Sequence, residues 1–110
     1  MISTHVLDVA LGLPARGVAV RLELLEADGS FTLLAASATN EDGRAPALAE
    51  PMKLAGRTCR LVFDTGAYFA AGGRSTFFPS VEVRFVLDGG ERCHVPLLLS
   101  PFGYSTYRGS

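Results

Sequence analysis

The sequence holds only two histidines, His5 and His94, and both stand where they are able to do chemistry. Each lies on the less apolar side of an alternating segment: His5 alternates with Ser3 and Leu7, and His94 alternates with Pro96. Imidazole titrates near neutral pH, so a histidine can take a proton from water and return it to a leaving group. The pair therefore fits acid–base catalysis, or the plainer role of two histidines at a strand surface or edge. A metal site needs further ligands, and no Cys/His cluster supplies them.

Two arginines and two serines are the next candidates. Arg44 follows a tight turn at residues 39–43, where an arginine is either solvated or offers a rigid fork of donors to a planar, anionic, carbonyl-rich ligand. Arg108 has the same two interpretations. Ser105 and Ser110 are candidate nucleophiles, but neither lies in a Gly-x-Ser-x-Gly elbow, which favours hydrogen bonding to a ligand.

The C-terminal stretch, residues 93–110, contains two short extended segments. One side of the first is uniformly apolar and belongs to a core, whereas the other carries His94. In the second segment, Ser105 and Tyr107 share a face. Chain ends are usually frayed and chemically bland, so a strand that ends on Arg108, a glycine and a serine invites a functional interpretation. A bend at Gly109 would turn the last residue back toward the histidines.

Composition narrows the class of protein. The chain has 110 residues, of which 48% are hydrophobic and 19% charged, so we expect one folded domain over residues 1–110. The net charge of -1, without a basic patch, argues against nucleic acid and anionic membrane surfaces as partners. No apolar run reaches membrane-spanning length. Because no secretory signal is recognisable at the N-terminus, we expect a cytoplasmic protein in which Cys59 and Cys93 stay reduced and unbonded.

The hydrophobic pattern predicts an all-β fold. Frequent Gly-containing turns separate short alternating runs, which is typical of a two-sheet β-sandwich. One short helix is predicted around Ala67–Ala71, before the stop at Gly72-Gly73. Asp8 and Asp64 are interpreted as turn caps. The predicted strands are Ile2–Val9, Arg16–Glu26, Phe31–Ser37, Arg57–Asp64, Ser80–Leu87, Glu91–Leu99 and Phe102–Arg108.

Three blocks carry a resemblance to a known family. They are residues 4–8 (Thr-His-Val-Leu-Asp), residues 39–44 (Thr-Asn-Glu-Asp-Gly-Arg), and residues 94–101 running into the terminal Tyr107-Arg108-Gly109-Ser110. The chain resembles the 5-hydroxyisourate hydrolases, the urate-pathway branch of the transthyretin family. Hormone-carrying transthyretins lack the two histidines, the arginine and the terminal tetrapeptide. One departure is Arg92, where many members of the family have a histidine.

The resemblance implies a transthyretin-like sandwich that assembles as a homotetramer, with its site at the dimer–dimer interface and no metal or organic cofactor. It implies a small-molecule substrate, 5-hydroxyisourate, whose ring opens when water adds to a carbonyl. Proton transfer falls to His5 and His94, the order between them left open, and Arg44 orients the substrate. The pocket is completed by Ser105, Tyr107, Arg108, Gly109 and Ser110. Two other classes of protein remain as alternatives: a carrier of small aromatic ligands, and a structural or adhesive sandwich.

Overall fold

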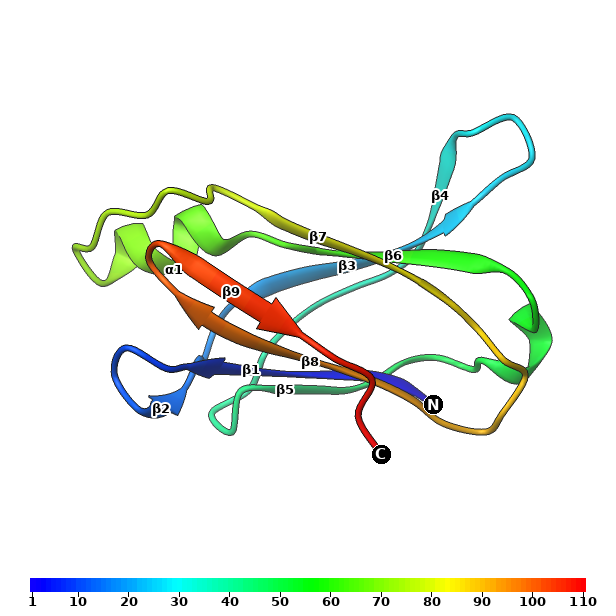
Figure 1. Ribbon diagram of the computed structural model, residues 1–110, viewed down its shortest axis with the longest axis horizontal. Coiled ribbons are helices and arrows are strands. Elements are labelled where there is room, and N and C mark those ends of the chain that lie inside the picture. The colour runs from blue at the N-terminus through cyan, green and yellow to red at the C-terminus, as the bar shows by residue number, and fades with distance from the viewer.

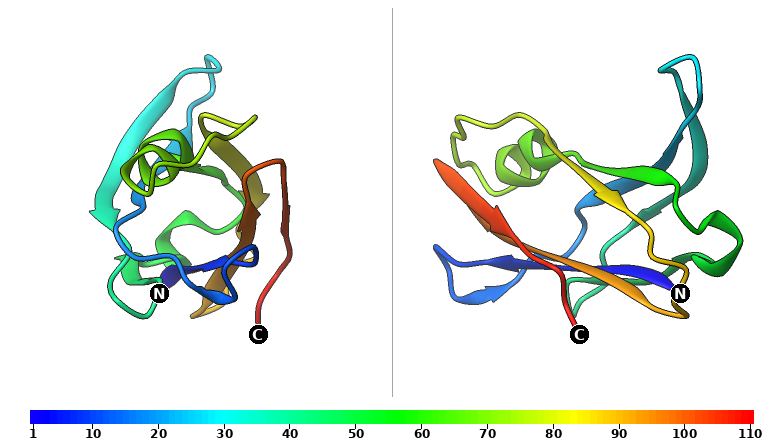
Figure 2. Two further views of the ribbon diagram at one scale, coloured as in Figure 1. Left: turned by 90° about the vertical axis from the view of Figure 1, so that its left-hand side faces the viewer. Right: turned by 45° about the vertical axis from the view of Figure 1, so that its right-hand side comes forward.

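The computed structural model describes residues 1–110, which form two β-sheets packed face to face (Figure 1 and, end-on, the left view of Figure 2). The first sheet has the order β2-β1-β8-β9, and β5 pairs with the same edge of β1 as β2 does. Its strands are β1 (Ile2–Asp8), β2 (Leu13–Pro14), β5 (Arg44–Ala49), β8 (Cys93–Ser100) and β9 (Gly103–Thr106). The pairing of β1 with β8 is parallel, whereas its neighbours on the other edge are antiparallel.

The second sheet is antiparallel and has the order β4-β3-β6-β7. Its strands are β3 (Ala19–Leu25), β4 (Phe31–Ala38), β6 (Thr58–Phe63) and β7 (Val81–Val86). A 3-10 turn, η1 (Met52–Leu54), and one α-helix, α1 (Thr65–Ala71), stand before and after β6. The predicted two-sheet sandwich with a single short helix is thereby confirmed. None of the helices is long and apolar enough to cross a membrane.

Alternation builds the core between the sheets. Along β6, Cys59, Leu61 and Phe63 are fully buried, and the apolar side of β8 is buried in the same way. Because successive side chains on a strand point to opposite faces, burial of one set directs the other set outward. The outer face of the first sheet is therefore where His5 and His94 lie. Cys59 and Cys93 are unbonded, in agreement with the prediction.

Helix α1 begins two residues before the predicted range and ends where the glycines predicted it would. Asp64 caps its N-terminus, since the carboxylate accepts a hydrogen bond from the Ala67 N–H at 3.1 Å. Gly72 caps its C-terminus. The prediction that Asp64 caps a turn is confirmed.

Asp8 does cap a turn, through a bond of 3.1 Å from the Leu11 N–H, but it also does more than predicted. Its carboxylate is completely buried and accepts hydrogen bonds from the Tyr68 hydroxyl at 2.8 Å and from Arg74 at 2.6 Å. The end of β1 is thus tied to helix α1 and to the loop that follows it. This pairing could not be predicted from the sequence, because the partners are 60 and 66 residues away from Asp8.

Three elements were not predicted: β2, β5 and η1. Strand β5 lacks regular alternation, because it is rich in alanine and contains Pro46, and only two of its residues, Ala45 and Leu48, are buried. Its pairing with β1, which shifts register between Ile2 and Thr4, makes it a strand.

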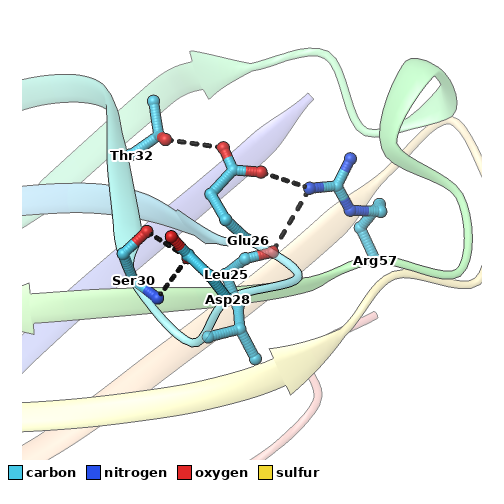
Figure 3. A network of polar contacts seen from close by, with 6 residues as sticks. All are labelled: Leu25, Glu26, Asp28, Ser30, Thr32 and Arg57. Carbon is cyan, nitrogen blue, oxygen red and sulfur yellow. Dashed lines mark hydrogen bonds and ion pairs between the residues drawn. The ribbon is translucent and has the colours of Figure 1, made fainter.

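The turn of the β3–β4 hairpin belongs to the second sheet, whereas the histidines lie on strands of the first, and it carries its own polar network (Figure 3). Asp28 accepts hydrogen bonds from the N–H and the hydroxyl of Ser30, at 2.9 and 2.6 Å. Glu26 accepts one from the hydroxyl of Thr32 at 2.6 Å and forms an ion pair with Arg57 at 2.9 Å. This network joins the hairpin to the start of β6 and offers a place for control substitutions that leave the first sheet untouched.

Candidate active site

Strand pairing gathers the predicted residues on the outer face of the first sheet. The antiparallel register of β1 and β5 puts His5 opposite Arg44, and the parallel register of β1 and β8 puts Ser3 opposite His94. Paired residues on neighbouring strands project from the same face. Since Thr4 between them is completely buried in the core, these four side chains project outward together.

A tight turn places Arg44. The side-chain oxygen of Asn40 accepts hydrogen bonds from the N–H groups of Asp42 at 2.9 Å and Arg44 at 3.0 Å. Gly43 has a φ of 76°, and a Cβ there would lie 2.4 Å from the carbonyl oxygen of Val6. Only glycine fits both the backbone conformation and this close approach. The turn is therefore locked against β1, and β5 starts at Arg44 in a fixed position.

The same turn holds His5. Its Nε2–H donates a hydrogen bond to the carbonyl oxygen of Asp42 at 2.9 Å. A carbonyl only accepts, so the neutral ring carries its proton on Nε2 and leaves the Nδ1 lone pair free. One turn thus orients both Arg44 and His5.

His94 is held on two edges of its ring. Nδ1 lies 2.8 Å from the hydroxyl of Ser3. At the other edge, Gly109 is so close that a Cβ there would come within 2.5 Å of Cδ2, and its N–H donates to the His94 carbonyl at 2.8 Å. The ring is thereby clamped between strand β1 and the C-terminal tail, residues 107–110.

The surroundings keep His94 neutral. Burial lowers its pKa most, and electrostatic interaction with the Arg44 guanidinium and with His5 lowers it further. Because the ordinary value is already near 6.5, His94 is unprotonated at neutral pH. An unprotonated imidazole is what a general base requires.

A cavity of about 610 Å³ opens beside His94. It is rich in positive charge, because three arginines reach it, of which Arg108 forms an ion pair with Asp88. Such a cavity suits an anionic ligand with several carbonyl groups. Its lining consists of Met1, Ser3, Arg44, Arg92, His94, Arg108, Gly109 and Ser110. His5 does not line it, although it stands opposite Arg44 in the strand pairing.

A second, smaller cavity of about 230 Å³ lies between β7 and β8 and shares His94, Arg92 and Arg108 with the first. Tyr107 lines this one, not the larger cavity. Ser105 lines neither and is exposed on β9 opposite Leu98. Three candidates near the C-terminus, Arg108, Gly109 and Ser110, thus line the larger cavity together with His94 and Arg44. Tyr107 lines only the smaller cavity, and Ser105 lines neither.

The tail keeps the register of strand β9 as far as Gly109, and a bend of the chain at this glycine stays a prediction. The bridge between His94 and Gly109 keeps the register of the β8–β9 pairing, and Gly109 is not among the glycines with positive φ. The tail runs alongside β8 as far as the bridge at Gly109, and its last residue lines the same cavity as Met1. Glycine is needed at 109 because a Cβ there would lie 2.5 Å from Cδ2 of His94.

Two positioning groups escaped the sequence reasoning: the hydroxyl of Ser3 and the side chain of Asn40. Ser3 was visible only as a residue alternating with His5. Asn40 was visible only as part of a turn, although asparagine commonly bonds to the backbone two residues on. Nowhere does the chain bring together three or more His, Cys, Asp or Glu side chains in the way that a metal ion requires.

Comparison with known proteins identifies the relatives of this chain. Residues 2–109 match the HIUase/Transthyretin family. The chain belongs to this family. It is 48% identical over 111 residues to the 5-hydroxyisourate hydrolase of Mus musculus, a match that covers 99% of this chain and 94% of the mouse protein. The resemblance stated from the three sequence blocks is thereby confirmed.

Solved structures of the family share the fold. Sea bream transthyretin, solved in complex with thyroxine, superposes with a TM-score of 0.91 at 31% identity, over 98% of this chain and 93% of the other. The 5-hydroxyisourate hydrolase of Klebsiella pneumoniae gives a TM-score of 0.79 at 40% identity, over 99% and 92%. Backbone similarity to transthyretin is thus at least as high as to the hydrolase, whereas sequence identity is higher to the hydrolase. Side chains, not the fold, must separate enzyme from carrier.

Proposed function

We propose that this chain, as a single domain over residues 1–110, hydrolyses 5-hydroxyisourate to 2-oxo-4-hydroxy-4-carboxy-5-ureidoimidazoline in urate degradation. One observation carries the proposal: a neutral His94, clamped by the tail, lies beside a cavity that Arg44 also lines. Similarity along the whole chain to proteins named 5-hydroxyisourate hydrolase supports it.

The geometry supplies each part that ring opening needs. A neutral histidine removes a proton from water while the water oxygen bonds to a ring carbonyl carbon. The carbonyl oxygen becomes an oxyanion, and the charged guanidinium of Arg44 is the group that donates hydrogen bonds to it. The oxyanion then collapses, the ring carbon–nitrogen bond breaks, and the departing nitrogen receives a proton from a histidine. The former carbonyl carbon becomes a carboxyl group of the ring-opened product, and this group loses its proton to solvent. The arginines around the cavity favour the negative charge of the oxyanion and of this carboxylate.

The proposed assembly is a homotetramer with the site at the dimer–dimer interface. The exposed edge strands support it. Val86 on β7 is 69% exposed and Tyr104 on β9 is 41% exposed, and both strands end their sheets. Uncovered edges carrying apolar side chains are best paired with another copy. Light scattering at micromolar concentration is expected to report four chains, and a stable monomer would contradict this assembly.

We also propose a cytoplasmic location. Its support is chemical: Cys59 is buried, Cys93 is half-buried, and neither is bonded. Two free thiols in a small domain fit a reducing compartment. Fractionation of cells that express the chain, followed by thiol labelling, tests this location.

The second candidate function is carriage of a small aromatic ligand. It is favoured by the close superposition on sea bream transthyretin, which was solved with thyroxine. The two functions differ in what they ask of the site: a carrier does not need a neutral histidine beside an arginine, whereas a hydrolase does.

The deciding experiment follows the ultraviolet decay of freshly generated 5-hydroxyisourate with and without the protein. Decay is expected to accelerate in proportion to protein concentration. His94→Ala should lose on the order of a hundredfold or more, because general acid–base groups contribute that much. Glu26→Ala, in the hairpin network of Figure 3, is the matched control and should retain the rate. A well-folded protein that leaves the spontaneous rate unchanged would refute the hydrolase and favour the carrier.

A further inference from the structure

We propose that Arg92 is a specificity-determining residue that binds the negative charge of a planar heterocyclic monoanion, on the side of His94 opposite Arg44. The larger cavity thereby selects anionic over neutral ligands. The inference rests on the proposed hydrolase function and deepens it, because it names the charge state of the substrate and the residue that recognises it.

Strand register places Arg92 and Arg44 on either side of His94. Arg92 comes two residues before His94, and both residues line both cavities. Arg44 is paired with His5, which is paired in turn with Pro96, two residues after His94. Measured along β8, the levels of the two arginines therefore lie two residues to either side of His94, or about 7 Å each. A small bicyclic ring that lies over His94 can contact both.

The guanidinium of Arg92 has no partner within the protein. Arg92 is exposed and forms neither an ion pair nor a side-chain hydrogen bond. Asp88 lines the smaller cavity with it, but both carboxylate oxygens of Asp88 are occupied: Oδ1 accepts from the Gly90 N–H at 2.8 Å, and Oδ2 accepts from Arg108. The donors of Arg92 are therefore all available to a ligand.

The larger cavity lacks acidic side chains that would neutralise its arginines. No Asp or Glu lines it. Of its three arginines, Arg108 is already paired, whereas Arg44 and Arg92 have no acidic partner. The two chain ends, which also line it, carry charges of opposite sign. The cavity is left with the charge of two guanidinium groups, and an anion is the ligand that balances it.

The two unpaired arginines differ in how they act on His94. Arg44 and His5 are the groups that act electrostatically on its imidazole, and Arg92 is not one of them. Arg44 meets the charge that develops during the reaction, whereas Arg92 meets charge that the ligand already carries. A contact that is equally strong before and in the transition state changes KM and not kcat.

The kinetic test replaces Arg92 with glutamine and with lysine. Arg92→Gln should raise KM by about tenfold, because a hydrogen bond to a charged group contributes about that much to binding, and should leave kcat nearly unchanged. The acid limb of kcat/KM should stay in place, since Arg92 is not among the groups that shift the pKa of His94. Arg92→Lys keeps the positive charge and should recover most of the lost affinity.

Arg21→Gln is the matched control. Arg21 lies on β3 in the second sheet, its side chain is half exposed, and it lines neither cavity, yet its loss removes the same charge from the protein. It should retain both KM and kcat. If Arg92→Gln behaves like Arg21→Gln, or lowers kcat at an unchanged KM, the proposal is overturned. Equal losses in Arg92→Gln and Arg92→Lys would overturn it too, because shape and not charge would then matter.

A binding measurement at neutral pH needs no turnover. Titration calorimetry with urate, a purine monoanion, and with hypoxanthine, a neutral purine, compares two charge states of one ring system. Urate should bind the unmodified protein more tightly than hypoxanthine does, and its Kd should rise about tenfold in Arg92→Gln. Hypoxanthine should bind both proteins alike. Added salt should weaken urate binding more in the unmodified protein than in Arg92→Gln, because exposed charges are screened.

These measurements separate failure of the proposal from failure of the function. Urate that binds the unmodified protein no better than hypoxanthine refutes the role of Arg92, even if the protein hydrolyses 5-hydroxyisourate. Loss of urate affinity in Arg92→Gln, without any hydrolysis by the unmodified protein, supports the role of Arg92 and refutes only the function.

Discussion

Gly109 packs so closely against the imidazole of His94 that no larger residue fits at position 109. A Cβ at 109 would lie 2.5 Å from Cδ2 and 3.2 Å from Cγ of the imidazole, and the Gly109 N–H donates to the His94 carbonyl at 2.8 Å. The tail therefore fixes where the ring stands, and any side chain at 109 must push the ring or the tail away.

Gly109→Ala should consequently reduce activity and leave the sandwich intact. Misplacement of a catalytic group by about 1 Å can cost on the order of a hundredfold in rate, and Gly109 lies outside the core. Gly103→Ala is the matched control, because a Cβ at 103 would meet only Ser100 Oγ, at 3.8 Å. Hydrolysis rate and melting temperature should be measured for both. Equal rates in the two variants would show that the contact with the ring is incidental.

Deletion of residues 107–110 tests whether the C-terminal tail forms an essential part of the lining of the active site. The tail lines both cavities, yet it is joined to the sandwich only by the Gly109 bridge and the exposed Arg108–Asp88 ion pair. Exposed ion pairs add at most about 1 kcal/mol. We therefore expect activity to be abolished while circular dichroism and the melting temperature change little. Near-normal rates in a well-folded truncated protein would overturn the assignment of the site.

Arg44 should tune the pH dependence of the reaction. A base works unprotonated, so the rate falls as pH drops through the pKa of His94. Burial, Arg44 and His5 all lower the pKa of His94. Its imidazole therefore stays unprotonated down to a pH below the ordinary pKa of histidine. Arg44→Gln removes a positive charge and should move the acid limb upward. Arg44→Lys keeps the charge and should leave the limb in place, while losing rate because the fork of donors is lost.

The profiles of kcat/KM against pH give the measurement for both variants. Arg44→Gln with an unmoved acid limb would mean that the limb does not report His94. A limb moved equally in the lysine variant would mean that shape, not charge, sets the pKa.

The parts of the fold that were predicted correctly are those in which burial follows local alternation. Strand β3 buries every second side chain, and β6 does so too, with Val62 buried in addition, so their apolar faces can be recognised in the sequence. Strand β5 was missed because its small residues and Pro46 show no period, and what makes it a strand is a partner some forty residues earlier.

The site, too, was only partly predictable from the sequence. Their residue types made His5, Arg44 and His94 candidates, but no feature of the neighbouring sequence indicates that they share a face of the sheet. Their convergence depends on the parallel pairing of β1 with β8, which joins residues about ninety positions apart. Ser3 was unremarkable in the sequence for this reason: its role is defined only by the strand that comes to lie beside it.

Asp8 provides a prediction about stability. The carboxylate is completely buried, with Arg74 at 2.6 Å and the Tyr68 hydroxyl at 2.8 Å. Burial alone would raise its pKa, but the hydrogen bonds from Arg74, Tyr68 and the Leu11 N–H outweigh burial and hold the pKa below its ordinary value. The Arg74 side chain is 25% exposed and so can be hydrated when its partner is lost. Asp8→Asn, which replaces charge-assisted hydrogen bonds by neutral ones at a buried position, should therefore cost about 2 kcal/mol of the free energy of unfolding at neutral pH.

The sign of the pH effect follows from the direction of the shift. A carboxyl whose pKa is lower in the folded than in the unfolded chain contributes stability above its unfolded value, about 3.9, and loses it as pH falls through the folded value. Urea unfolding of both proteins, at equal chain concentration, should therefore show a large gap at about pH 7 that narrows at about pH 3. Tyr68→Phe, which removes one neutral donor, should cost only about 1 kcal/mol. A gap of equal size at both pH values would mean that Asp8 acts by shape rather than by charge, and that its bond to Arg74 adds nothing.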